Sequence, residues 1–234
     1  MKTILNRKSQ ITNRAAFTLI ELLVVISIIG VLAAFTIPVL TSVKAGQYKK
    51  VARGELELIA TALENYKAKY GAYPPGNALA VSATYTPALL PQLYYELSGT
   101  TTSGTSFVTL DGSSTITSAS AAYGVGGFIN CTKGSGEDAA SAKNFLPGIS
   151  QKMLYYNWTN GVATTILVTS VNGPDDKYHP LNPVSGVGPN PFRYKCPGDN
   201  NPNGYDLWVQ LVIKGQTNLI CNWSRQVIIN SPLP

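Results

Sequence analysis

A long apolar run, from Phe17 to Val43, constrains this chain more than any other feature. It contains one charged residue, Glu21, close to its start. As an α-helix rising ~1.5 Å per residue, the run is roughly 40 Å long, which exceeds the ~30 Å hydrocarbon core of a bilayer. The sequence therefore predicts a membrane-spanning helix over 17–43. Because an ionised carboxylate is costly in hydrocarbon, Glu21 is expected to be protonated or to have a cationic partner.

The residues before this run form a short basic segment. Met1 to Ala16 contains four basic residues and no acidic residue. By the positive-inside rule, this segment stays in the cytoplasm and the chain after the helix is exported. A secretory signal peptide is the alternative, but its apolar region is shorter and its small residues follow that region, whereas Ala15 and Ala16 precede the run.

The charge balance gives no indication of nucleic-acid binding. The net charge of the 234-residue chain is +6, but four of its 18 basic residues lie in the leader. The remaining 14 Lys and Arg face 12 Asp and Glu, which is an ordinary balance with a weak electrostatic footprint. The length is that of one domain plus an anchor.

After Lys44 the pattern becomes amphipathic, with apolar residues at three- and four-residue spacing. No proline interrupts it before Pro74, and Gly71 is a typical helix stop. We therefore expect one helix from about Phe17 to Tyr70, whose second half, 44–71, packs on a sheet. The apolar positions are Val51, Leu58, Ile59, Ala62, Leu63, Tyr66 and Tyr70, and the polar positions include Lys49, Lys50, Arg53, Glu57, Glu64, Lys67 and Lys69.

The rest of the chain, 72–234, predicts an exported globular domain. Thr86 and Pro87 indicate the start of a short helix over 87–97 that ends near Gly99. Residues 98–127 and 128–161 are predicted to be loop, with at most a short strand near 107–110. β-Branched and aromatic residues predict strands at 162–171, 192–196, 205–213 and 218–223, with a hairpin turn at 213–217. The expected fold class is α+β, a long N-terminal helix packed on a small antiparallel sheet.

The segment Ala16-Phe17-Thr18-Leu19-Ile20-Glu21 and the apolar run resemble the leader and first helix of type IV pilins and of the pseudopilins of type II secretion. The resemblance implies a pilin-like fold and cleavage by a prepilin peptidase between Ala16 and Phe17, which removes residues 1–16. It also implies methylation of the new Phe17 amine and pairing of that amine with Glu21 of a neighbouring subunit. Pro38 falls where the first helix of this family often kinks.

Two further segments extend the resemblance to the major pseudopilin of type II secretion. One is Ala68-Lys-Tyr-Gly-Ala-Tyr-Pro-Pro-Gly76, and the other is Asn190-Pro-Phe-Arg-Tyr-Lys-Cys-Pro-Gly198 with Gly204-Tyr-Asp-Leu207. The family pattern then continues into a loop that helps to hold calcium, and this chain has Trp208-Val-Gln-Leu-Val-Ile213 instead.

One oxygen-rich stretch keeps a calcium hypothesis open; no other cofactor is expected. Residues 199–204 match the first half of a calcium loop, but its twelfth position is Gln210, where the complete loop has a bidentate glutamate. The alternative is an Asx-rich turn between strands. The candidate ligands are Asp199, Asn201, Asn203 and Asp206.

Three widely spaced cysteines allow one disulfide in an oxidising compartment. Cys196 and Cys221 both lie in the strand-rich region and are the predicted pair, which leaves Cys131 free. The alternative is three unpaired thiols that pack as small hydrophobic residues.

Catalytic motifs do not emerge from the sequence. The single histidine, His179, lies beside Pro180, and the adjacent Asp175 and Asp176 follow a Gly-Pro turn. The resemblance implies a non-enzymatic pseudopilin in the inner membrane, with its N-terminus cytoplasmic and its domain periplasmic. Its implied partners are further copies, other pilins, the prepilin peptidase, the assembly platform and lipid. The alternatives are a type IV pilin with adhesion, motility or DNA-uptake duties, and a membrane-tethered periplasmic binding domain that does not polymerise.

Overall fold

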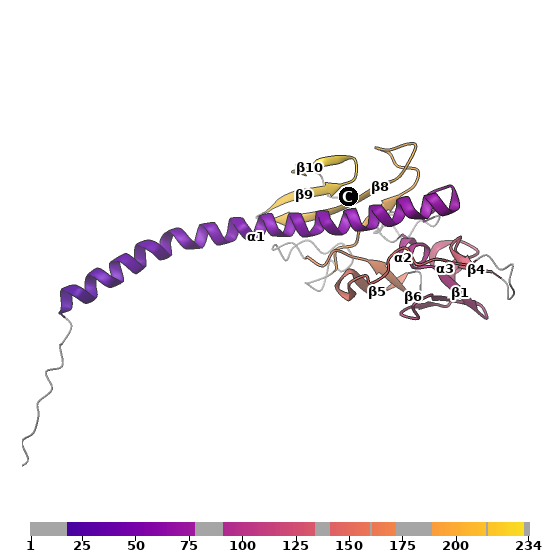
Figure 1. Ribbon diagram of the computed structural model, residues 1–234, viewed down its shortest axis with the longest axis horizontal. Coiled ribbons are helices and arrows are strands. Elements are labelled where there is room, and N and C mark those ends of the chain that lie inside the picture. Colours follow the sequence, from indigo (N-terminus) through magenta and orange to yellow (C-terminus); the bar gives the residue numbers. More distant parts are fainter. Residues whose placement is uncertain are drawn as a thin grey trace, which may run out of the picture. The chain divides into compact units, whose positions relative to one another are not determined.

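In the computed structural model the chain forms two compact units, Met1–Lys44 and Ala45–Pro234 (Figure 1). The structure describes residues 18–77, 91–133, 141–159, 161–171, 189–213 and 215–231.

Helix α1 runs from Leu19 to Tyr70, as the sequence predicted. It ends where expected, because Gly71 adopts a positive φ of 77° and donates its N–H to the Lys67 carbonyl at 2.8 Å. Helix assignment continues through Pro38, and the kink expected there stays a prediction. Among the described residues, no helix combines the length and the apolar character needed to cross a membrane. The span predicted over 17–43 stays a prediction.

Within the second unit, α1 contributes one apolar seam to the core. Its members alternate at spacings of four and three residues, which places them on one face of the helix. They are Ala52, Leu56, Ile59, Leu63 and Tyr66, all buried. The prediction that Leu58 belongs to this face is wrong, since its side chain is 46% exposed. It follows Leu56 by only two residues, which turns it away from the seam.

Two charged side chains of α1 are bound to backbone groups of the domain. The Arg53 guanidinium donates to the Cys221 carbonyl at 2.6 Å and to the Ser224 carbonyl at 3.1 Å. The Glu55 carboxylate accepts from the Thr169 hydroxyl at 2.7 Å and from the Ser170 N–H at 3.2 Å. These directional bonds connect α1 to the backbone at residues 221–224 and to residues 169–170.

The C-terminal sheet has four antiparallel strands in the order β10-β9-β8-β7 (Figure 1). The four strands are β7 (Arg193–Lys195), β8 (Asp206–Ile213), β9 (Gln216–Cys221) and β10 (Ser224–Ile229). The first three and the β8–β9 hairpin confirm the prediction, while β10 was not predicted. The α+β class is thus confirmed.

The predicted Cys196–Cys221 disulfide is wrong, because all three cysteines are free thiols. Cys221 pairs with Trp208 of β8, and Cys196 follows Lys195 at the end of β7. Strand β8 lies between the two cysteine-bearing segments. Adjacent strands are ~4.8 Å apart, so a two-strand separation of about 9.6 Å exceeds the ~7 Å Cα limit for a disulfide.

The middle of the chain is far more ordered than the loop that its composition predicted. A second sheet, in the order β3-β2-β1-β4, pairs β1 antiparallel with β2 and parallel with β4. Strands β5 and β6 form a separate antiparallel hairpin. The elements are β1 (Thr100–Ser103), β2 (Ser106–Thr109), β3 (Thr115–Ile116), α3 (Ala119–Tyr123), β4 (Cys131–Thr132), the 3₁₀ turn η2 (Gln151–Met153), β5 (Leu154–Thr159) and β6 (Val162–Leu167).

The short helix predicted at 87–97 exists but begins later. Helix α2 spans Leu93–Ser98 and is followed by Gly99, as expected. Gly99 has a positive φ of 69°, and an added Cβ would lie 2.9 Å from the Lys143 carbonyl oxygen, so a side chain is excluded there. Thr86 and Pro87 lie outside the described residues.

A buried carboxylate joins α1, α2 and the segment before β4. Glu96 accepts from the Tyr66 hydroxyl at 2.9 Å and from the N–H groups of Ile129 and Asn130 at 2.9 and 3.0 Å. The Asn130 side chain extends the network, since its Oδ1 accepts from the Tyr70 hydroxyl at 2.6 Å. Burial raises the pKa of Glu96, and its hydrogen bonds only partly oppose that effect.

We expect Glu96→Gln to change both stability and its pH dependence. An amide N–H₂ in place of one oxygen would face backbone donors, which costs about 1–3 kcal/mol of unfolding free energy. Because the folded pKa is raised, the native state binds more protons than the unfolded chain above the ordinary glutamate pKa of roughly 4.3. Wild-type stability should therefore fall as the pH rises through the folded pKa, and the variant should lose that slope.

The measurement is urea unfolding of the full chain in detergent from acidic to neutral pH. Glu57→Gln is the control, because Glu57 is an exposed glutamate in the interior of α1. A Glu96→Gln slope equal to that of the wild type would contradict the assignment.

Candidate functional site

The start of α1 places Glu21 in a reciprocal cap. Glu21 Oε2 accepts from the Thr18 N–H at 2.8 Å and from the Thr18 hydroxyl at 2.7 Å. The Thr18 hydroxyl oxygen in turn accepts from the Glu21 N–H at 3.3 Å. This is a capping box, which Thr-x-x-Glu produces when threonine precedes the first turn. The Thr18–Glu21 spacing carried this signal in the sequence, and the prediction did not use it.

The cap changes how the charge of Glu21 is understood. From the sequence, this carboxylate was expected to be protonated or to have a cationic partner, whereas two donors of the same chain already satisfy part of its hydrogen-bonding capacity. A cation on another chain remains compatible, because a carboxylate has about four acceptor positions. Ala16 and Phe17, the predicted cleavage residues, lie outside the described residues.

The helix after this cap has an apolar surface on all sides. Every residue from Leu19 to Leu32 is exposed, and Leu, Val and Ile predominate among them. A helix that is apolar all round is typical of one that other helices or lipid surround. In the described part of the unit Met1–Lys44, the capping box and the apolar surface of Leu19–Leu32 could direct association with another helix or with lipid.

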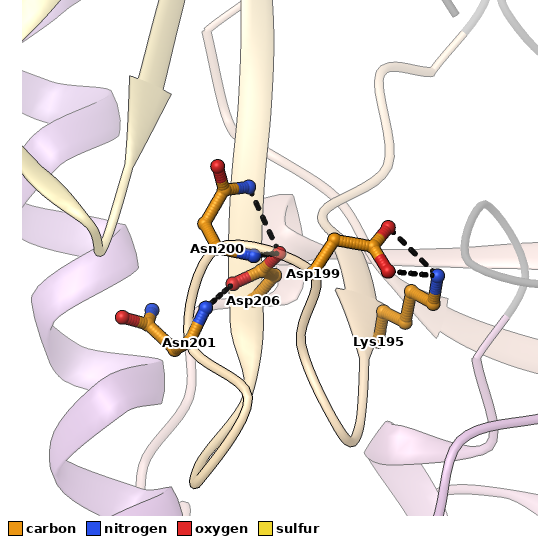
Figure 2. A network of polar contacts seen from close by, with 5 residues as sticks. All are labelled: Lys195, Asp199, Asn200, Asn201 and Asp206. Carbon is orange, nitrogen blue, oxygen red and sulfur yellow. Dashed lines mark hydrogen bonds and ion pairs between the residues drawn. The ribbon is translucent and has the colours of Figure 1, made fainter.

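The predicted calcium residues form a different kind of site (Figure 2). Asp206 Oδ2 accepts from the backbone N–H and the side-chain Nδ2 of Asn200, at 2.9 and 3.0 Å. Asp206 Oδ1 accepts from the Asn201 N–H at 3.1 Å. The Asp199 carboxylate turns to the Lys195 ammonium group, at 2.6 and 2.7 Å, and away from Asp206.

This arrangement does not fit a calcium ion. Calcium needs oxygen atoms that converge on a shared position, whereas both Asp206 oxygens receive N–H hydrogens and Asp199 faces a cation. The amide of Asn201 Nδ2 donates to the Tyr205 carbonyl at 3.0 Å. Within the described ranges, no group of three His, Cys, Asp or Glu residues could hold a metal. The geometry is that of the alternative prediction, an Asx-rich turn.

Gly198 makes this turn possible by its lack of a side chain. A Cβ there would lie 2.5 Å from Asp206 Oδ1 and 2.8 Å from the Asp206 N–H nitrogen. The backbone can therefore approach the Asp206 carboxylate only at a glycine.

A groove of about 860 Å³ lies between α1 and this turn. The Tyr73 hydroxyl donates to both oxygens of Glu64 within it, at 3.0 and 3.1 Å. Its lining residues include no serine, cysteine, lysine or histidine. His179, Asp175 and Asp176 lie outside the described residues. The lining includes Glu57, Glu64, Tyr73, Asn201, Tyr205 and Asn222.

Comparisons with known proteins gave one family model and one relative that match parts of the chain. Residues 11–37 match the model of the prokaryotic N-terminal methylation motif. The chain is also 43% identical over 61 residues to the type II secretion system core protein G of Pseudomonas aeruginosa. That match covers 26% of this chain and 43% of the relative, so it spans less than half of either protein. No solved structure matches.

We expect Asp206→Asn to destabilise the domain without any dependence on metal. The amide N–H₂ would replace one of the two oxygens and face the N–H donor of Asn201 or the two donors of Asn200, at a cost of about 1–3 kcal/mol in unfolding free energy. Asp199→Asn is the control and should cost at most ~1 kcal/mol, because the Lys195–Asp199 pair is exposed. Thermal unfolding of the full chain in detergent measures both effects.

The same measurement with excess calcium or with EDTA should give an unchanged midpoint. A calcium-dependent increase that Asp206→Asn abolishes would show that the turn rearranges into a metal site.

Proposed function

We propose that this chain is a pseudopilin, a non-enzymatic filament subunit of a type II secretion system that polymerises at the inner membrane to drive protein export. The observation that carries the proposal is the capped and predominantly apolar start of α1, which lies within a matched N-terminal methylation motif. The methylation motif is common to type IV pilins and pseudopilins, so it does not distinguish between them. The 61-residue similarity to a type II secretion core protein favours a pseudopilin.

In this proposal, proteolytic processing creates a cationic partner for the Glu21 carboxylate. A prepilin peptidase cuts between Ala16 and Phe17, and the new amine is methylated. The amine is a cation one residue before Thr18, at the end of an apolar helix. In surroundings of low dielectric, its pairing with the Glu21 carboxylate of a neighbouring copy is far stronger than in water. The capping box holds that carboxylate at the start of the helix.

The apolar surface of segment 17–43 contacts lipid first and other subunits later. Before assembly, the segment 17–43 is buried in the inner membrane, with the leader on the cytoplasmic side and the domain in the periplasm. During assembly, an inner-membrane platform brings copies and other pilins together, and helix–helix packing replaces lipid contacts.

Assembly should require the charge of Glu21 and not its capping bond. Glu21→Ala removes both, whereas Thr18→Val removes the hydroxyl of the cap and keeps the carboxylate. Each loses about 1 kcal/mol of helix capping, so any difference between them reports the charge. We expect Glu21→Ala to abolish filaments and Thr18→Val to retain them, as counted by electron microscopy of cells that express the secretion machinery.

Equal filament numbers in wild type and Glu21→Ala would refute the proposed assembly. A protein that only tethers a binding domain to the membrane would be insensitive to both substitutions.

Processing should appear directly in the mass of the mature chain. In a host with an active prepilin peptidase, we expect an N-terminus at Phe17 that carries one methyl group, as measured by mass spectrometry of the purified protein. The matched control is the same host without the peptidase, in which the chain should keep Met1. An intact Met1 in both hosts would exclude the proposed processing.

A further inference from the structure

The exposed aromatic residues of the described chain are concentrated on one short strand. Tyr156 and Trp158 of β5 are 70% and 73% exposed, and Tyr155 is 39% exposed. Other large aromatic side chains, such as Tyr66, Tyr94, Tyr123 and Phe192, are buried in the core. Tyrosine and tryptophan are enriched at the energetic centres of protein interfaces. Their exposure here indicates a surface that another molecule covers.

Strand β5 also lies at the edge of its sheet. The hairpin contains only β5 and β6, and β6 packs against α2, α3 and β3. Among the described residues, no strand pairs with the outer side of β5. An unprotected edge of this kind is a template for another strand.

The hairpin register identifies which backbone groups point outward. The Thr165 N–H donates to the Tyr95 hydroxyl at 2.9 Å, and therefore not to β5. Thr165 pairs with Tyr156, so Tyr156 is at a non-hydrogen-bonded position of the hairpin. The N–H and C=O groups of Tyr156, and by alternation those of Trp158, consequently point to the free edge.

Charge distinguishes β5 from the two edges of the C-terminal sheet. The sequence Leu154-Tyr-Tyr-Asn-Trp-Thr159 and its partner β6 contain no charged residue, and their ladder has no bulge. The six-residue edge strand β10 contains Arg225 and an irregular register, and β7 contains Arg193 and Lys195. Two copies can meet at β5 without bringing like charges together, which they cannot do at β7 or β10.

We propose that β5 is the contact between two copies of this chain, paired antiparallel about a two-fold axis at Asn157. Tyr156 of each copy then lies opposite Trp158 of the other, on the same face of a continuous sheet β6-β5-β5-β6. The register uses the outward-pointing groups of Tyr156 and Trp158 for hydrogen bonds, and it forms two aromatic cross-strand pairs.

The contact goes beyond the proposed function and does not depend on it. Successive subunits of a polar filament are related by rotation and translation, whereas a two-fold contact closes on itself. Pairing through β5 therefore joins copies in different filaments, or two copies that are not assembled.

Asn157→Cys tests this register. The two Asn157 residues would form a non-hydrogen-bonded pair with Cα atoms about 4.5 Å apart, which lies within the range for a disulfide. We expect mild oxidation of the full-length variant in membranes to give a disulfide-linked dimer on a non-reducing gel. Gln226→Cys, on the exposed face of β10, is the matched control and should remain monomeric.

Trp158→Lys in the Asn157→Cys background supplies the second test. A lysine on the edge should reduce the dimer yield by about tenfold or more, because it removes an aromatic pair and brings like charges together. Ile229→Lys on β10 should leave the yield unchanged. Since Trp158 is largely exposed, the substitution should preserve the fold, which the thermal unfolding midpoint checks.

The absence of a dimer above the Gln226→Cys level would overturn the proposal, as would a dimer that survives Trp158→Lys. A strand of a different protein on this edge would also leave the 157–157 bond unformed.

Discussion

The burial of one seam of α1 is the interaction on which the domain depends. Ala52, Leu56, Ile59, Leu63 and Tyr66 pack into a core that includes residues of both four-stranded sheets and of α2. Truncating one buried Leu or Ile to Ala typically costs about 2–5 kcal/mol, which is a large share of the stability of a domain. Neither a six-residue helix such as α2 nor a two-stranded hairpin is stable in water by itself. These elements therefore rely on the seam for a surface to cover.

Charged side chains complete this packing through the backbone. Arg53, Glu55, Glu96 and Asp206 each bind backbone N–H or C=O groups of segments that are distant from them or irregular. A loop that approaches a core must satisfy its peptide groups, and a charged side chain forms a stronger bond to them than a neutral one. Such bonds are directional and partly shielded from solvent, so salt should weaken them less than exposed ion pairs. Of these four side chains, Glu96 binds the middle segment, at the N–H groups of Ile129 and Asn130.

The sequence predicted the elements that have a strong periodic signal and missed those that depend on tertiary contacts. The extent of α1 followed from its uniform and then amphipathic pattern, and its end followed from Gly71. Strands β8 and β9 followed from β-branched and aromatic runs. By contrast, β1 is a run of Thr and Ser, whose composition is typical of loops, and its pairing with β2 and β4 depends on neighbours that the local sequence does not specify.

The candidate sites were also predicted only in part from the sequence. Glu21 was identified from the cost of a lone carboxylate, although its bonds to Thr18 were overlooked. The residues around Asp206 were correctly singled out as an oxygen-rich cluster, but ligand types alone do not specify which way N–H groups point. Glu96 could not be found, because its burial arises from contacts with Tyr66 and Asn130, 30 and 34 residues away.

The two association surfaces of the chain have different symmetry, and this difference limits what each can build. The apolar surface of α1 from Leu19 to Leu32 is exposed on all sides, so each helix can contact several others and the contacts can repeat without closing. In the described part of the chain, no strand pairs with the outer side of β5, and the proposed two-fold contact there is saturated by one partner. A weak edge contact between single copies would become strong between two filaments, because every subunit along both contributes a site at high effective concentration. Growth and lateral association would then be controlled by separate residues, and either could change without loss of the other.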